Sequence, residues 1–189
     1  MNFEELKHKL TQKSVSRIVN EHVLSSNPVC FNAKPELIWE IKEAISKHFH
    51  IHKKNIEIVG SAKLGVSLSE ERLGEDFENT SDIDLAVVSD ELFNAAWNEL
   101  LEMEFDWYKL SQPERDAIND NYKTIPRGFV SPERLPKNNF KEKWWQVFST
   151  LSNKSKYEHR KIRGRLFKNW WFVEKYYSIQ ISNIKNKKA

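Results

Sequence analysis

Two aspartates, Asp82 and Asp84, are the residues whose types and spacing most directly suggest chemistry. They open an apolar run, 83–88, that we expect to form a β-strand. Because successive side chains of a strand point to opposite faces, the two carboxylates should share one face. Carboxylates held side by side repel each other unless a cation lies between them. Mg²⁺ suits such a place, because one or two carboxylates hold it while water and phosphate oxygens complete its shell.

A second apolar run, Ile56–Val59, is also predicted to be a strand, and it ends in Gly60 and Ser61. Glycine lets the backbone approach a ligand closely, and the serine offers a hydroxyl and an N–H to a phosphate. A helix that starts after Ser61 would add its N-terminal dipole. Lys63 lies two residues further on, where it would either meet a triphosphate or face solvent.

These motifs together resemble a known family. A Gly-Ser that closes one strand, followed by an Asp-x-Asp that opens the next, resembles the signature of the DNA polymerase β-like nucleotidyltransferase superfamily. The likeness covers about residues 56–89, and its longer form, GSAKLG followed by SDIDLAVVS, is most similar to small bacterial stand-alone nucleotidyltransferase-domain proteins. It implies an α/β (α+β) fold with a short mixed sheet flanked by helices.

The resemblance also implies an activity, which is transfer of a nucleotidyl group from an NTP to an unidentified hydroxyl acceptor with Mg²⁺ (or Mn²⁺). Small stand-alone relatives often belong to bacterial defence or toxin–antitoxin systems. Metal binding and catalysis would fall to Asp82 and Asp84. The residues implied for nucleotide binding are Gly60, Ser61, Lys63, Ser81, Arg163 and Arg165.

Active members of this superfamily usually add a third carboxylate from a later strand. The later strand that we expect here, 161–167, offers arginines instead. Glu158, just before it, is the nearest candidate for a catalytic acid, and Asp106 is a remoter one. An acid that folds to within metal-bridging distance of the two aspartates would favour an enzyme. An ion pair between an aspartate and Arg163 or Arg165 would instead favour a silenced site.

Two other functions therefore remain open. The first is a catalytically degenerate nucleotidyltransferase fold that binds a nucleotide or a partner protein, for which the Trp-rich segment 141–148 and the aromatic C-terminal helix would offer a surface. The second and weaker is RNA binding through the basic run 154–168, whose lysines and arginines alternate with aromatic residues. The net charge of +3 argues against strong non-specific binding of nucleic acid.

The composition of the chain is typical of a globular protein, with 39% hydrophobic and 30% charged residues among 189. We expect one domain over 1–189, with its core in about 35–105 and 155–184 and a helical and loop segment, 106–154, between them. The acidic N-terminus does not resemble a signal peptide, and no apolar run approaches the roughly 20 residues of a membrane helix. A cytoplasmic protein without membrane contact is the expectation.

Helical periodicity predicts the elements that surround the sheet. The expected helices cover 3–23, 35–48, 90–101, 140–151 and 169–184. The first and last of these would be helical extensions at the two ends of the chain. Between the elements we expect a solvated polar insertion over 69–80 and an ordered loop over 123–139. Gly164 would mark a bulge or a close backbone approach in a short edge strand, and the lysines Lys185, Lys187 and Lys188 a frayed tail.

Overall fold

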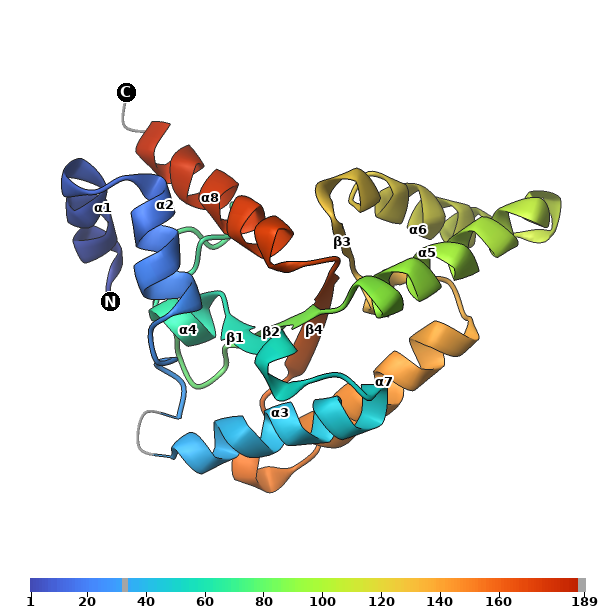
Figure 1. Ribbon diagram of the computed structural model, residues 1–189, viewed down its shortest axis with the longest axis horizontal. Helices are drawn as coiled ribbons and strands as arrows, with labels where there is room; N and C mark the ends of the chain where they lie inside the picture. Colours follow the sequence, from blue (N-terminus) through green and yellow to red (C-terminus); the bar gives the residue numbers. More distant parts are fainter. Residues whose placement is uncertain (32–33, 187–189) are drawn as a thin grey trace.

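A four-stranded mixed β-sheet forms the centre of the computed structural model, which describes residues 1–31 and 34–186 (Figure 1). Its strands are β1 (Ile56–Val59), β2 (Ile83–Val88), β3 (Phe129–Val130) and β4 (Ile162–Phe167), and they lie side by side in the order β1-β2-β4-β3. The two central strands, β2 and β4, run parallel, and each outer strand runs antiparallel to its neighbour. The predicted fold class, a short mixed sheet flanked by helices, is confirmed.

Strand β4 was predicted as a short edge strand, and that position is wrong. It lies inside the sheet, between β2 and the two-residue strand β3, which the sequence pattern did not reveal. Its register against β2 is unbroken, so Gly164 is not a bulge. A Cβ at Gly164 would lie 2.3 Å from Phe148 and 2.5 Å from Trp144, so the glycine allows these rings to press onto the sheet.

The predicted helices occur close to their expected positions, and one helix, α6 (Gln112–Tyr122), was not predicted. The bounds of the others are α1 (Phe3–Gln12), α2 (Val15–Ile18), the π-helix η1 (Val19–Leu24), α3 (Pro35–Phe49), α4 (Ser61–Leu64), α5 (Asp90–Phe105), α7 (Asn139–Ser152) and α8 (Trp170–Asn186). The single helix expected over 3–23 is divided, because the Ser14 side chain accepts a hydrogen bond from the Arg17 N–H and starts a new helix. None of the described helices combines the length and apolarity needed to cross a membrane.

Helices cover both faces of the sheet (Figure 1). On one face, α3 and α7 bury side chains such as Ile41 and Trp144 against Ile58 and Leu85. On the other face, α1, α2, η1 and α8 pack together over Val59, Ala86, Val88 and Phe167. In α8, the inward residues recur every three or four positions, as an amphipathic helix requires. The terminal helices, expected as extensions, therefore form a layer of the fold.

The segment 106–154 was expected to lie outside the core. Instead it supplies both β3 and α7, and Trp144 of α7 is fully buried. Two of its short 3₁₀ turns, η4 (Ile125–Arg127) and η5 (Pro132–Arg134), flank β3. Of the expected C-terminal tail, Lys185 lies in the last turn of α8, and Lys187 and Lys188 lie outside the described residues.

Candidate functional site

A cavity of about 250 Å³ opens where β1 ends and β2 begins, beside α8. It is called the acidic cavity below. The predicted site residues that line it are Gly60, Ser61, Ser81, Asp82, Asp84, Arg163 and Arg165. Gly60 and Ser61 follow β1, Ser81 and Asp82 precede β2, Asp84 lies in β2, and the two arginines lie in β4. Most of the residues that the sequence suggested for one site are therefore brought together.

The sheet register explains this convergence. Asp84 is paired with Val59 of β1 and with Arg163 of β4, and partners in neighbouring strands direct their side chains to one face. Gly60 follows Val59 with φ +65° and ψ −148°, a conformation that is essentially restricted to glycine. A Cβ there would lie 3.2 Å from Oδ2 of Asp84, so the glycine brings the backbone against the carboxylate.

Tyr177 of α8 lines the acidic cavity together with Gly60. Burial raises the pKa of its phenol well above its usual value, so the hydroxyl stays neutral at physiological pH. Sequence periodicity placed Tyr177 only on the apolar face of the last helix and gave no sign of this position.

The carboxyl group of Asp84 lies in an environment that disfavours its charge. Asp84 reaches solvent through the acidic cavity, yet protein atoms crowd around its carboxyl group. This burial raises the pKa of Asp84, and the neighbouring Asp82 raises it further, whereas Arg165 and Arg163 lower it. The charged form of Asp84 therefore lacks compensation, which is the condition that a bound cation relieves.

Arg163 forms an ion pair with Asp82, with its Nε 3.2 Å from Oδ2. Within the described residues, this buried Nε–H has no hydrogen-bond partner. Arg165 forms no ion pair in the same part of the chain, and its guanidinium lies over the rings of Phe129 and Tyr176, with centroids at 5.2 and 4.6 Å. The site thus contains the arginine–aspartate ion pair that would favour a silenced site. In this ion pair, however, the Nε–H of Arg163 has no hydrogen-bond acceptor.

A third carboxylate, which sequence reasoning missed, also lines the acidic cavity. Glu133 lies in η5, directly after the buried strand β3. Burial raises the pKa of Glu133, and Asp84 and Asp82 raise it further, against the lowering effect of Arg163 and Lys161. The only available signal was its position after the apolar pair Phe129-Val130, and that pair was predicted to belong to a loop.

The structure does not bring Glu158 to the aspartates. It lies at the end of a short 3₁₀ turn, and its Oε2 is 3.0 Å from Nη2 of Arg160. It lines a different cavity, beside Cys30. Asp106 is not among the residues that line the acidic cavity. It is exposed, and its Oδ1 lies 2.8 Å from Nζ of Lys109. Glu158 has a left-handed backbone conformation and ends its 3₁₀ turn before β4 begins, so its side chain lies outside the acidic cavity.

Lys63 does not reach the acidic cavity either. It is buried, and its Nζ lies 2.7 Å from Oε1 of Glu57, which also binds Lys42 at 2.6 Å. Helix α4 is a single turn, so the residue two positions after Ser61 points back along β1 rather than towards the cavity. So short a helix also contributes little of the expected dipole.

The residues fit a metal ion only in part. Within the described ranges, no group of three or more His, Cys, Asp or Glu side chains gathers closely enough to hold one. Asp82 and Asp84 nevertheless supply the hard oxygen ligands that Mg²⁺ prefers, and Mg²⁺ commonly takes its remaining ligands from water and substrate phosphates. The pair therefore fits an ion that arrives with a phosphate substrate, and does not fit a cage made of protein ligands alone.

Comparison with known proteins gives no match of any kind: no family model, no curated protein and no solved structure matches this chain. The acidic cavity and the residues that line it are therefore the main guide to function. Their charges are the most informative feature, because acids and arginines face one small space.

Proposed function

We propose that the protein is a Mg²⁺-dependent nucleotidyltransferase that moves a nucleoside monophosphate from an NTP to a hydroxyl acceptor. The observation that carries the proposal is the convergence of Asp82 and Asp84 with the Gly60-Ser61 turn and with arginines in one cavity. Carboxylates suit the metal, and guanidinium groups match phosphate oxygens with paired hydrogen bonds. A triphosphate bound with Mg²⁺ needs both.

Binding of the substrate rearranges the charges of the acidic cavity. Asp82 and Asp84 would hold the metal ion, and Asp82 would then give up its ion pair with Arg163, whose Nε–H would gain a phosphate oxygen as acceptor. Ser61 and the backbone at Gly60 would hold the phosphate chain against the start of β2, and Arg134 would supply further positive charge at the cavity wall.

The reaction needs a base as well as a phosphate site. The acceptor oxygen forms a bond to the α-phosphorus, the bond from that phosphorus to the bridging oxygen breaks, and pyrophosphate leaves with the electron pair. Glu133 takes the proton of the acceptor hydroxyl, a role for which a raised pKa is suitable. When bound, Mg²⁺ neutralises charge that develops on the phosphate oxygens.

One observation favours a second candidate, a catalytically degenerate fold that binds a nucleotide or a partner protein. The Arg163–Asp82 ion pair already balances one of the two aspartates. If that pair persists when nucleotide is present, the cavity binds phosphate through arginine alone and transfers nothing. A bacterial defence role, a cytoplasmic location and RNA binding stay predictions under either candidate.

The test uses the four NTPs, each radiolabelled at the α-phosphate, with Mg²⁺ or Mn²⁺ and with or without cell extract. We expect label to move to an acceptor with the wild type and not with an Asp82→Asn/Asp84→Asn variant. Glu158→Gln is the control, because Glu158 lies outside the acidic cavity. Nucleotide binding without transfer would favour the degenerate candidate. The absence of both would refute the transferase and the nucleotide-binding form of the degenerate candidate, and would leave only the binding of a partner protein.

A further inference from the structure

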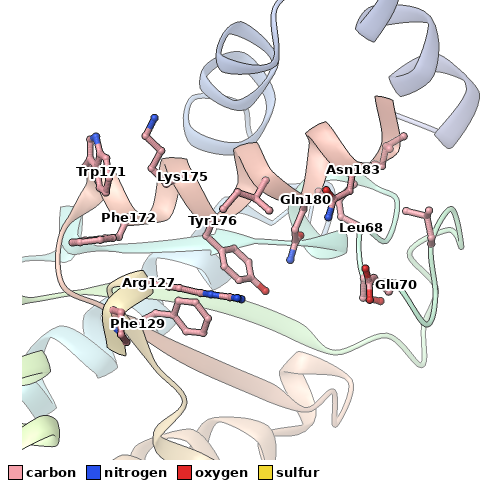
Figure 2. A pocket seen from close by; sticks show the side chains of 15 residues that line it. Leu68, Glu70, Arg127, Phe129, Trp171, Phe172, Lys175, Tyr176, Gln180 and Asn183 are labelled. Atoms are coloured by element: carbon pink, nitrogen blue, oxygen red, sulfur yellow. The ribbon is translucent and has the colours of Figure 1, made fainter. Parts of the chain in front are cut away.

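A second cavity, of about 520 Å³, adjoins the acidic cavity (Figure 2). It lies between α8, the turn η4 and the loop around Leu68, and is called the aromatic cavity below. Four residues line both cavities: Leu68, Ser69, Tyr176 and Gln180. A ligand in one cavity is therefore separated from a ligand in the other by a shared wall of only a few side chains.

The aromatic cavity is mostly apolar and is built by packed rings. Phe129, Trp171, Phe172 and Tyr176 line it, and in Figure 2 Phe172 and Tyr176 project from α8 towards the side on which Phe129 lies. A Cβ at Gly128, which has φ +71°, would lie 2.0 Å from Phe172, so the glycine lets this ring settle against η4. Trp171 is 57% exposed, an unusual state for a large apolar side chain.

The polar groups of the aromatic cavity fit a ligand with its own negative charge. Arg127 and Lys175 line it, and neither forms an ion pair within the described part of the chain. Lys175 lies 5.3 Å from the ring centroid of Trp171. The amides of Gln180 and Asn183 offer both donors and acceptors, which suit the edge of a nucleobase. The cavity also includes one acid, Glu70, so its charge remains positive.

We propose that the aromatic cavity binds the acceptor and that the acceptor is a nucleotide unit, a nucleobase with its own phosphate. This inference rests on the proposed function and names its substrate class. Aromatic walls stack with any base, and Arg127, which has no ion pair in the described part of the chain, suits a phosphate. The donor triphosphate meets arginines in the acidic cavity, so it does not account for this further arginine next door.

The proposal fixes what the reaction makes. The ribose hydroxyl of the acceptor reaches past the shared residues into the acidic cavity, where its oxygen bonds to the α-phosphorus of the donor and pyrophosphate leaves with the electron pair of the broken bond. The hydroxyl proton goes to Glu133, as above. The product is a phosphodiester between two nucleotides. A free nucleotide and the 3′ end of an RNA offer the same base, phosphate and hydroxyl, and the experiment distinguishes these two sources.

The experiment measures binding to the full chain by calorimetry, with the wild type and four variants. The probes are AMP and a short RNA with a free 3′-hydroxyl, both without NTP. Trp171→Ala and Arg127→Ala change the aromatic cavity, and Asp84→Asn changes the acidic one. Trp145→Ala is the matched control, because Trp145 is 59% exposed on α7 and lies away from both cavities.

We expect Trp171→Ala to weaken binding of a probe about tenfold, as loss of one base-stacking ring does, and Arg127→Ala to weaken it as well. Trp145→Ala and Asp84→Asn should leave it unchanged. Tighter binding of the RNA would identify an RNA end, and tighter binding of AMP a free nucleotide. Binding that follows Asp84→Asn instead, or no binding of either probe, would overturn the inference.

Transfer assays then separate this inference from the proposed function. Label transfer that proceeds onto a non-nucleotide acceptor, with Trp171→Ala fully active, would overturn the inference and leave the transferase standing. Probe binding at the aromatic cavity without transfer from any NTP would refute the transferase and retain the ligand class of the aromatic cavity.

Discussion

Replacing Lys63 by methionine should destabilise the protein and leave nucleotide binding intact. The Lys63 side chain is 1% exposed, and its Nζ lies 2.7 Å from Oε1 of Glu57. Methionine preserves much of the volume of the lysine stem and removes the charge. The substitution therefore leaves Glu57 with one cation, Lys42, in place of two.

The magnitude follows from the burial of the partner that remains. Removing one member of a fully buried ion pair costs about 3–5 kcal/mol, because the other charge is stranded. The Glu57 side chain keeps Lys42 at 2.6 Å and is 18% exposed, so its charge stays partly compensated. We expect a loss of about 2 kcal/mol in the free energy of unfolding, which lowers the Tm of a chain of this length by about 4–8 °C.

Thermal unfolding followed by circular dichroism at pH 7 measures this loss. Lys47→Met is the matched control, because Lys47 is 75% exposed and its ion pair with Glu43 should contribute little. Calorimetry with ATP and Mg²⁺ supplies the second readout. An unchanged Tm together with lost ATP binding would refute the reasoning and return Lys63 to the nucleotide site.

Three further predictions concern the acidic cavity and the sheet beneath it. The folded protein holds the pKa of Asp84 above the usual 3.8, so the negative charge of Asp84 costs stability at neutral pH. Asp84→Asn should therefore raise the Tm at pH 7, and this gain should shrink as the pH falls to 3.8. A lower Tm of the variant at pH 7 would contradict the prediction. Because the pKa of Glu133 is also raised, transfer should decline as falling pH protonates Glu133. Glu133→Gln should remove this acidic limb of the pH–rate profile and slow transfer about 10²–10⁴-fold. An acidic limb that is retained in the variant would show that another group is the base. Gly164→Ala should lower the free energy of unfolding by about 1–3 kcal/mol, because the added Cβ would overlap Phe148 and Trp144. Unfolding in urea measures this loss. An unchanged free energy of unfolding would show that the two rings move aside easily.

Local patterns in the sequence were sufficient to predict the centre of the acidic cavity. Strand alternation places Asp82 and Asp84 on one face whatever the rest of the chain does, and a Gly-Ser after an apolar run predicts a turn. The structure has both features, and it adds the reason for Gly60, whose backbone conformation excludes other residues beside Asp84. These properties depend on residues that are close in the sequence.

The remaining site residues depend on contacts between distant segments. Glu133 enters the cavity because β3 pairs with β4, and a two-residue strand has too few residues to show a periodicity. Tyr177 enters the cavity because α8 packs across the sheet. Lys63 was misplaced for a related reason. Spacing from Ser61 suggested a phosphate ligand, but the partly buried Glu57 beside it attracts the charge more directly.

Binding of ATP to the purified protein, measured by calorimetry with and without Mg²⁺, tests the central claim most directly. The account predicts binding that requires Mg²⁺, that is lost in Asp82→Asn/Asp84→Asn and weakened in Arg163→Gln, and that survives in Lys63→Met. Binding that is independent of Mg²⁺ and unaffected by the two aspartate substitutions would contradict it, because the acidic cavity would then not be the nucleotide site.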